Sequence, residues 1–280
     1  MSLKRAVLRW NGATNRWFER NTRREQHFEL YKRLVGEAAQ RSSVIVHLGA
    51  GNVWLGDLCP VSLQGKTIYA VEPDAETLAR NPAQHRIEAG GEAIPLPAES
   101  VDAIVCEYVV EHLTEPERVL RESHRLLRPG GRFVFVTPNW LSYSGIITAL
   151  TPQWLHQLFL KWLFDLGGSA NEKPYPTAFR MNTVWDVRRL AHETGFDVRE
   201  LQTGVDYPTY TYPFPLVHQL AVLWHVLLDR VEWLAPFRIT LIGVLEKPPV
   251  KPLPKPEEKL VHPPASPPPT PIFSGQARIS

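Results

Sequence analysis

The sequence has few cysteines, almost no net charge and no apolar run long enough to cross a bilayer. Its two cysteines, Cys59 and Cys106, show no CxxC spacing, so they indicate neither a disulfide framework nor a zinc site, and a reducing cytoplasm is the expected compartment. The 31 Lys and Arg residues against 29 Asp and Glu give a formal charge of +2, which is not typical of nucleic-acid-binding proteins. The almost wholly apolar run Leu216–Leu228 has only about thirteen residues, whereas a transmembrane helix needs roughly twenty.

Apolar side chains, by contrast, make up 44% of the 280 residues, which is enough for the core of one sizeable domain. We expect an N-terminal helical cap at residues 1–42, a main domain at 43–247 and a proline-rich tail at 248–280 that cannot form a core. The cap is rich in Arg and aromatic residues, a pattern typical of amphipathic helices that cover a sheet or close over a substrate. The alternative is a cationic surface that binds anionic lipid.

Short apolar runs alternate with amphipathic stretches between residues 44 and 139, which is typical of βαβ units and a parallel sheet. The predicted strands are Val44–Leu48, Thr67–Val71, His85–Glu88, Val101–Cys106, Arg132–Thr137, Phe196–Leu201 and Phe237–Glu246. Helices are predicted at Glu115–Leu127, where Pro129 and two glycines follow as breakers, and at Thr183–Gly195. The sequence therefore predicts an α/β fold.

The stretch Val44–Asn52, VIVHLGAGN, combines a strand-like apolar run with two glycines in the loop that follows. Gly49 and Gly51 allow a tight turn and a close approach of the backbone to a ligand. About twenty residues later Glu72 ends the next strand, where a carboxylate can accept both hydroxyls of a ribose. Trp54 replaces the third small residue of the dinucleotide fingerprint, and no Gly-Lys-Ser/Thr follows the glycines. The pattern therefore favours a nucleoside ligand without phosphates.

Four segments in this order and spacing, VIVHLGAG, YAVEPD, EAIPLPAESVDAIVCEYVVEHL and LLRPGGRFVFVTPN, resemble the class I S-adenosylmethionine-dependent methyltransferases, in particular the branch that includes ubiquinone-biosynthesis-type O-methyltransferases. The resemblance is strong over residues 43–140 and weaker as far as residue 247. It implies a Rossmann-like, doubly wound sheet of about seven strands, mostly parallel with an antiparallel last strand, with helices on both faces. It also implies S-adenosylmethionine as the cofactor.

The resemblance assigns the methionine part of the cofactor to the glycine loop, the ribose to the end of the second strand, the adenine to the segment before the fourth strand and the sulfonium to the end of that strand. The residues that it implies for cofactor binding are His47, Gly49, Ala50, Gly51, Glu72, Pro73, Glu92, Ala93, Ile94, Cys106 and Glu107. His47 stands where the family usually has an acidic residue for the methionine ammonium, and Glu107 is expected to take over part of that role. Val53 and Gly90 also depart from the family pattern.

Methyl transfer from a sulfonium depends mainly on positioning, and a base is needed only where the acceptor loses a proton. His112, in the Glu-His pair implied by the resemblance, is the predicted base; the alternative is that it bonds to the backbone and shapes its loop. Tyr108 is the second candidate catalytic residue, whereas Glu111 is interpreted as a structural carboxylate. The carboxylates and imidazole here form an incomplete ligand set, so no metal is predicted.

Two insertions, residues 140–182 and 206–236, are expected to cover the acceptor in the fold that the resemblance implies. The predicted substrate contacts are Asn139, Trp140, Tyr143, Tyr175 and Arg180. The second insertion contains the run Leu216–Leu228, which is expected to be either a buried lid helix or an interfacial helix that gives access to a lipid-like acceptor.

The sequence thus predicts a methyltransferase, cytoplasmic or peripherally bound to a membrane, that acts on a small-molecule, lipid, lipid-linked or sugar acceptor, with oxygen as the target atom and without a nucleic-acid partner. A non-catalytic relative that binds S-adenosylmethionine and serves assembly is the alternative, based on His47, Val53 and Gly90. A nicotinamide-dependent oxidoreductase is a third reading, which Trp54 disfavours.

Overall fold

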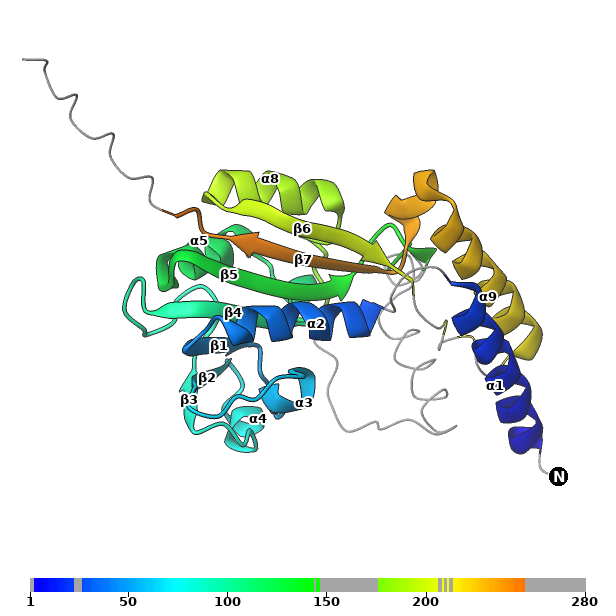
Figure 1. Cartoon of the computed structure of the whole chain (residues 1–280), viewed down its shortest axis with the longest axis horizontal. Helices are drawn as coiled ribbons and strands as arrows, with labels where there is room; N and C mark the ends of the chain where they lie inside the picture. Colours follow the sequence, from blue (N-terminus) through cyan, green and yellow to red (C-terminus); the bar gives the residue numbers. More distant parts are fainter. Residues whose placement is uncertain are drawn as a thin grey trace, which may run out of the picture. The chain divides into compact units, whose positions relative to one another are not determined.

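The chain is built around one mixed β-sheet, as a computed structural model shows (Figure 1). The structure describes residues 3–22, 27–143, 145–146, 176–205, 208, 211 and 214–249, and the elements below belong to one unit, Met1–Pro249. The strands are β1 Val44–Leu48, β2 Thr67–Glu72, β3 His85–Glu88, β4 Val101–Glu107, β5 Leu127–Pro138, β6 Asp197–Gly204 and β7 Thr240–Glu246. Their order is β3-β2-β1-β4-β5-β7-β6, and β7 is antiparallel to both of its neighbours, which confirms the predicted mostly parallel sheet with an antiparallel last strand.

Helices cover both faces of this sheet, as the resemblance implies. The helices are α1 Leu3–Asn21, α2 His27–Gln40, α3 Leu55–Leu58, α4 Ala75–Ala79, α5 Pro116–Leu126, α8 Val184–Thr194 and α9 Pro215–Arg230, with the 3₁₀ helices η1 Val110–His112 and η3 Glu232–Phe237. On one face, Leu34 of α2 packs with Ile45 and Val134 of the sheet. On the other face, α5 and α8 bury their apolar side chains against the opposite surfaces of the same strands. Each central strand is therefore buried on both sides, which explains its continuous apolar sequence.

Helix ends lie where the sequence predicts them when the capping signal is local. Thr183 caps α8 by accepting a hydrogen bond from the backbone N–H of Asp186, and Gly195 ends the helix with φ +83°. β7 begins at Thr240, so the predicted start at Phe237 is wrong. Phe237 instead closes η3, where the buried Arg238 guanidinium donates to the carbonyl of Leu228 at 2.9 Å.

β5 and β6 also differ from their predicted bounds. β5 begins at Leu127 rather than Arg132, because the Pro-Gly-Gly segment after α5 lies within the strand, where the pairing with β4 is irregular. β6 runs to Gly204, three residues beyond the predicted end at Leu201, because Gln202, Thr203 and Gly204 continue to pair with β7.

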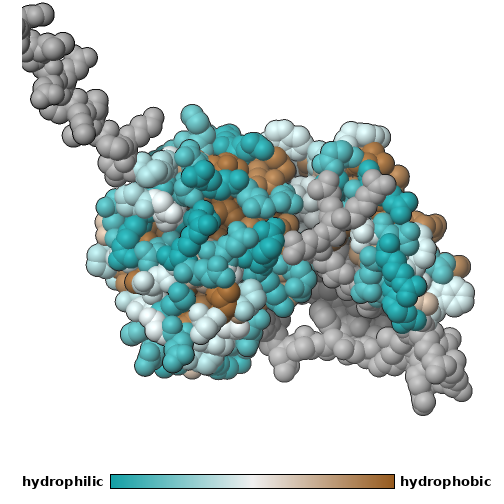
Figure 2. Space-filling view, in the orientation of Figure 1, coloured by the Kyte–Doolittle hydropathy of each residue, from teal (hydrophilic) through white to brown (hydrophobic). Residues whose placement is uncertain are grey.

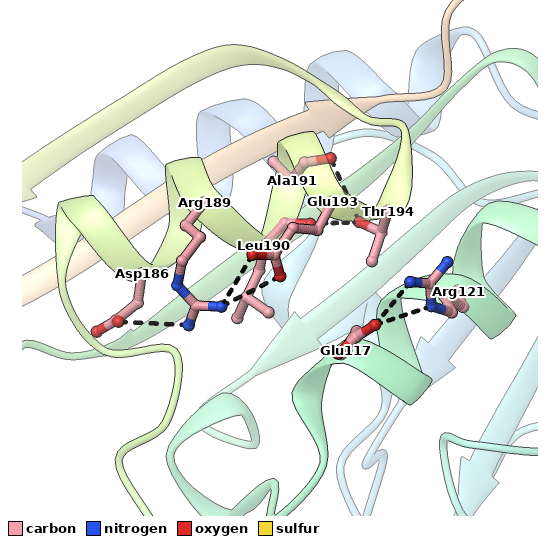
Figure 3. A network of polar contacts seen from close by, with 8 residues as sticks. All are labelled: Glu117, Arg121, Asp186, Arg189, Leu190, Ala191, Glu193 and Thr194. Atoms are coloured by element: carbon pink, nitrogen blue, oxygen red, sulfur yellow. Dashed lines mark hydrogen bonds and ion pairs between the residues drawn. The ribbon is translucent and has the colours of Figure 1, made fainter.

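The exposed surface of α5 and α8 carries ion pairs within each helix (Figure 3). Arg121 binds Glu117 on α5 at 2.6 Å, and Arg189 on α8 lies 3.1 Å from Glu193 and 3.7 Å from Asp186. These side chains are well exposed, and exposed pairs at i, i+3 and i, i+4 typically contribute a few tenths of a kcal/mol. The network is therefore a solvated helix surface.

α1 and α9 pack along one another (Figure 1). Phe18 of α1 is fully buried against Val222 and Val226 of α9, and the His218 imidazole lies 3.0 Å from the Asn15 side chain across the pair. α2, the second helix of the predicted N-terminal cap, covers the sheet, whereas α1 packs on α9. Among the described residues, no helix is both long and apolar enough to cross a membrane.

Candidate functional site

The predicted cofactor residues follow the carboxyl ends of neighbouring strands. β2 and β3 lie to one side of β1 and β4 lies to the other, so the strand order reverses between β1 and β4. Such a reversal leaves a crevice at the carboxyl edge of a parallel sheet, where ligands of this fold class bind. Gly49 and Gly51 follow β1, Glu72 ends β2, and Tyr108 follows Glu107 at the end of β4.

The glycine loop after β1 needs both glycines, for different reasons. Gly49 has φ +64°, and a Cβ added there would lie 2.2 Å from Cγ2 of Val109. Gly51 has φ +48°, but an added Cβ would meet only Cγ2 of Thr77, at 3.8 Å. Ala50 between them is buried and donates its N–H to the carbonyl of Val71 at 3.1 Å. Gly49 is therefore closed in by Val109 of the loop after β4, whereas the space beside Gly51 is open to a ligand.

Glu72 connects the end of β2 to this loop. One carboxylate oxygen accepts the N–H of Gly51 at 3.1 Å, and the other accepts the N–H of Asp74 at 3.2 Å. A carboxylate can accept about four hydrogen bonds, so each oxygen keeps capacity for a hydroxyl donor. This arrangement fits the two hydroxyls of a ribose, while Pro73, the next residue, is exposed beside the site.

Asn81 fixes the glycine loop and was missed by the sequence analysis. Its buried side-chain amide donates to the carbonyls of Ala50, Gly51 and Val53 at 3.3, 2.9 and 3.0 Å, and its oxygen accepts the N–H of Ala83 at 2.9 Å. Buried carbonyls without partners are costly, so this one side chain stabilises most of the loop. An Asn before a proline gives only a turn signal in the sequence, which does not reveal these contacts.

Replacing Asn81 by alanine is expected to lower the free energy of unfolding by about 2–3 kcal/mol, because the buried carbonyl of Ala50 and the partly buried carbonyls of Gly51 and Val53 lose their donor. We also expect weaker binding of S-adenosylmethionine, since the loop conformation is then less populated. Chemical denaturation and calorimetric titration measure the two effects. Asn52→Ala, at an exposed position of the same loop, is the matched control and should change neither quantity. Equal stability of the two variants would contradict the role assigned to Asn81.

Two side chains of α5 bind the main chain of the predicted adenine segment. The N–H of Ile94 donates to the Glu122 carboxylate at 2.8 Å, and its carbonyl accepts from the Arg125 guanidinium at 3.1 Å. The Ile94 side chain is buried, whereas Ala93 is exposed and Glu92 is half-buried. The segment is thus a fixed backbone whose outer residues remain accessible to a planar base.

His47 and Glu107 differ in charge at neutral pH. Burial lowers the pKa of His47 to about 4, so its imidazole is neutral and cannot replace the missing carboxylate. Burial raises the pKa of Glu107 to about 7, although the Lys32 ammonium acts in the opposite direction. The Cys106 thiol is fully buried, and burial raises its pKa well above the usual value, so the thiol stays neutral. Glu107 is therefore the group that can supply a negative charge at the end of β4.

The N-terminus of α2 reaches the end of β4, which the sequence analysis also missed. Tyr108 has φ +49°, and its hydroxyl lies 3.0 Å from Nε2 of His27, the first residue of α2. One turn later the Tyr31 hydroxyl is fully buried and has no hydrogen-bond partner in the described structure. Burial, followed by the charge of Glu107, raises the pKa of Tyr31 well above its usual value. α2 therefore places polar side chains near the end of β4.

Glu111 ties the loop after β4 to the segment at 176–182. Its buried carboxylate accepts the Thr137 hydroxyl at 2.8 Å, and the Asn182 amide donates to that hydroxyl oxygen at 2.7 Å. The main-chain carbonyl of Glu111 also accepts the N–H groups of Ala178 and Phe179 at 2.7 and 3.1 Å. These contacts agree with the structural interpretation of Glu111. The N–H of Trp140 further donates to the carbonyl of Asn182 at 3.0 Å, which joins the two ends of the first insertion.

His112 contacts the same segment through Nδ1, which lies 3.0 Å from the carbonyl oxygen of Pro176. A carbonyl can only accept, so Nδ1 must carry the proton of this contact. In a neutral imidazole the lone pair is then on Nε2, which lies 3.9 Å from the Glu111 carboxylate. The geometry is compatible with both sequence hypotheses, a base at Nε2 and a loop contact at Nδ1.

Two of the predicted substrate residues are engaged in packing. Asn139 is buried, and its amide donates to the carbonyls of Pro236 and Arg238, both at 2.7 Å. The Tyr143 ring lies 5.6 Å from the His225 ring of α9. The first contact joins the end of β5 to the segment before β7, which sequence spacing alone did not indicate.

Trp140 is the predicted substrate residue that lines a cavity. The cavity has a volume of about 680 Å³ and lies between the segment after β5 and the start of α8. Its lining residues are Trp140, Leu141, Thr177, Ala178, Phe179, Thr183, Trp185 and Asp186. Arg180 directly follows the lining residue Phe179 and is exposed. Tyr175 lies outside the described residues.

Comparisons with known proteins agree with this geometry. Residues 46–135 match the family model described as a methyltransferase domain. A probable S-adenosylmethionine-dependent methyltransferase of Mycolicibacterium smegmatis is 34% identical over 143 residues, which cover 49% of this chain and 52% of the relative. A ubiquinone/menaquinone biosynthesis C-methyltransferase of Rubrivivax gelatinosus is 33% identical over 112 residues, covering 37% of this chain and 43% of the relative. The chain thus spans about half the length of the curated relatives that it matches.

A solved structure shares the fold. The structure of a geranyl diphosphate methyltransferase in complex with GPP and sinefungin aligns with a TM-score of 0.50 at 12% identity, covering 78% of each chain. The matched family model, the relatives and the site at the carboxyl edge of the sheet lead to one assignment. The chain carries a methyltransferase domain at residues 46–135 and is similar to S-adenosylmethionine-dependent methyltransferases.

Proposed function

We propose that this protein transfers a methyl group from S-adenosylmethionine to an oxygen atom of a small-molecule, lipid, lipid-linked or sugar acceptor. The observation that carries the proposal is the bond from Gly51 N–H to the Glu72 carboxylate, which joins an open glycine loop to a ribose-binding group at the strand reversal. The cavity lined by Trp140 and Trp185 supports an acceptor with a flat apolar face, because both indoles are substantially exposed there.

The chain's own residues fit the parts of the cofactor, which supplies an electrophilic methyl group on a sulfonium. Glu72 would hold the ribose, the Gly49–Gly51 backbone would hold the methionine part, and Glu107 would balance the positive charge of the ammonium. His112 would accept the acceptor's hydroxyl proton at Nε2, since Nδ1 is committed to Pro176. Since a sulfonium is already an activated leaving group, orientation by these contacts supplies most of the acceleration.

Isothermal titration with S-adenosylmethionine and with its demethylated product tests the cofactor half of the proposal. We expect micromolar binding of both, and Glu72→Gln should weaken it by about 10- to 100-fold, as expected for loss of a charge-assisted hydrogen bond. Glu88→Gln is the matched control, because Glu88 pairs with Glu72 across β2 and β3 but is exposed. No binding to the unmodified protein would refute the proposal.

The transfer itself is tested by mass spectrometry of lipids and glycans from cells with and without the gene. A molecule that carries one extra methyl group on oxygen only when the gene is present would support the proposal. Binding of the cofactor without any such molecule would instead support the non-catalytic alternative, in which the domain serves assembly.

Binding of S-adenosylmethionine is expected to strengthen with pH between about pH 6 and 8. The pKa of Glu107 near 7 leaves mostly a neutral acid at the lower pH and mostly a carboxylate at the higher, and only the carboxylate attracts the ammonium. The association constant should therefore rise about tenfold over this range. Calorimetric titrations at several pH values measure the change, and Glu107→Gln should remove it. An unchanged slope in that variant would exclude Glu107 as the titrating group.

A further inference from the structure

One face of α9 is apolar and exposed along its length. Four leucines occupy this face, and Leu216 and Leu220 expose 73% and 67% of their surfaces. The exposed apolar residues of the helix are Leu216, Val217, Leu220, Leu223, Trp224 and Leu227, and Trp233 follows in η3 with 77% exposed. No charged residue occurs between Phe214 and Leu228. Figure 2 shows hydrophobic surface in the region of this helix.

The spacing places these side chains on a single stripe. Leu216, Leu220, Leu223 and Leu227 follow the i, i+4, i+7, i+11 pattern of one helix face. The opposite face, centred on the buried Val222, is the one that packs on α1. The inner faces of the two helices are thus packed against each other, whereas the outer stripe of α9 is apolar and exposed. An exposed apolar stripe of this kind is uncommon on a protein surface that contacts only water.

Positive charge accompanies the stripe. α1, which packs along α9, has the sequence LKRAVLRWNGATNRWFERN, with five basic residues and one acidic residue. Arg16 and Arg20 are exposed on it, as are Trp10 and Trp17. At the C-terminal end of the stripe, the Arg230 guanidinium donates to the main-chain carbonyl of Asn21 at 3.2 Å, which holds a cation where α9 meets α1.

We propose that the paired helices α1 and α9 form a docking surface for an anionic lipid bilayer. The leucine stripe would enter the boundary between headgroups and acyl chains, and the arginines would bind anionic headgroups. Exposed tryptophans suit the same interface, because their rings are apolar and their N–H groups are polar. A second copy of the chain is a poorer occupant, since a symmetric contact would bring two basic α1 helices together. The inference does not depend on the proposed function.

Co-sedimentation of the full chain with vesicles tests this inference without cofactor or acceptor. Binding is expected to vesicles that contain phosphatidylglycerol and to be much weaker with phosphatidylcholine alone. Leu220→Glu with Leu223→Glu should reduce binding at least tenfold, because two exposed apolar side chains become charged. Gln64→Glu with Gln84→Glu adds the same charge at exposed positions elsewhere and is the matched control. Arg16→Gln with Arg20→Gln should reduce the preference for phosphatidylglycerol.

Circular dichroism melting and titration with S-adenosylmethionine check that each variant is folded. Equal vesicle binding by the leucine variant and by its control would overturn the inference. The inference would also be overturned if analytical ultracentrifugation showed a dimer that the leucine substitutions dissociate, and if the unmodified chain did not bind vesicles. Failure to bind S-adenosylmethionine would refute the proposed function but leaves vesicle binding as an independent result.

Discussion

Gly49→Ala is expected to reduce the affinity for S-adenosylmethionine by more than about 100-fold, equivalent to ~2.7 kcal/mol. Two effects combine at this position. The backbone has φ +64°, a conformation that costs a non-glycine residue roughly 1–3 kcal/mol, and the new Cβ would lie 2.2 Å from Cγ2 of Val109. Since Val109 directly precedes η1, relief of this contact would also displace the Glu111-His112 pair. The substitution therefore alters both walls of the crevice.

Gly65→Ala separates the two effects. Gly65 has φ +75°, but an added Cβ there meets nothing within 4 Å. We expect this control to lose about 1 kcal/mol of stability and to bind S-adenosylmethionine normally. Calorimetric titration and thermal melting compare the two proteins. If Gly49→Ala bound as tightly as Gly65→Ala, the contact with Val109 would not be important for the loop.

His112→Ala is expected to lower the rate of methyl transfer by about 100- to 1,000-fold, the usual contribution of a positioned base, with little change in cofactor affinity. The rate is measured as release of the demethylated cofactor in the presence of a lipid and glycan extract.

His112→Asn distinguishes catalysis from loop structure. An asparagine amide can donate to the Pro176 carbonyl as Nδ1 does, but it has no basic nitrogen. If His112 is the base, both variants should be slow. Near-normal activity of His112→Asn would instead assign the residue to holding the segment at 176–182, which is the alternative reading of the sequence.

The glycine loop and Glu72 could be predicted from the sequence because their signals are local. The loop conformation depends on residue types within a few positions of Gly49, and Glu72 is placed by the end of its own strand. The alternation of apolar runs likewise predicts the sheet, since strands buried on both faces have continuous apolar sequences. Local patterns thus predict the fold and the residues proposed to bind the cofactor.

The remaining site residues depend on contacts between distant segments. His27 meets Tyr108 across 81 residues, and Asn81 meets the Gly51 carbonyl across 30. No periodicity marks either residue, because a buried Asn or a helix-initiating His has the same local sequence signal wherever it packs. The prediction of where β7 starts was wrong for a related reason. The buried Arg238 stabilises a 3₁₀ turn at positions whose sequence is typical of a strand.

The hydrogen bond between Trp140 and Asn182 has a consequence for how this protein can diversify. It closes the first insertion at its base, and Glu111 anchors the same end through Ala178 and Phe179. The length and composition of the chain between these anchors can therefore change without moving β5, η1 or the cofactor loop. If the insertion contacts the acceptor, as proposed, new acceptor specificities can evolve there while the residues proposed for the methyl donor stay under separate selection.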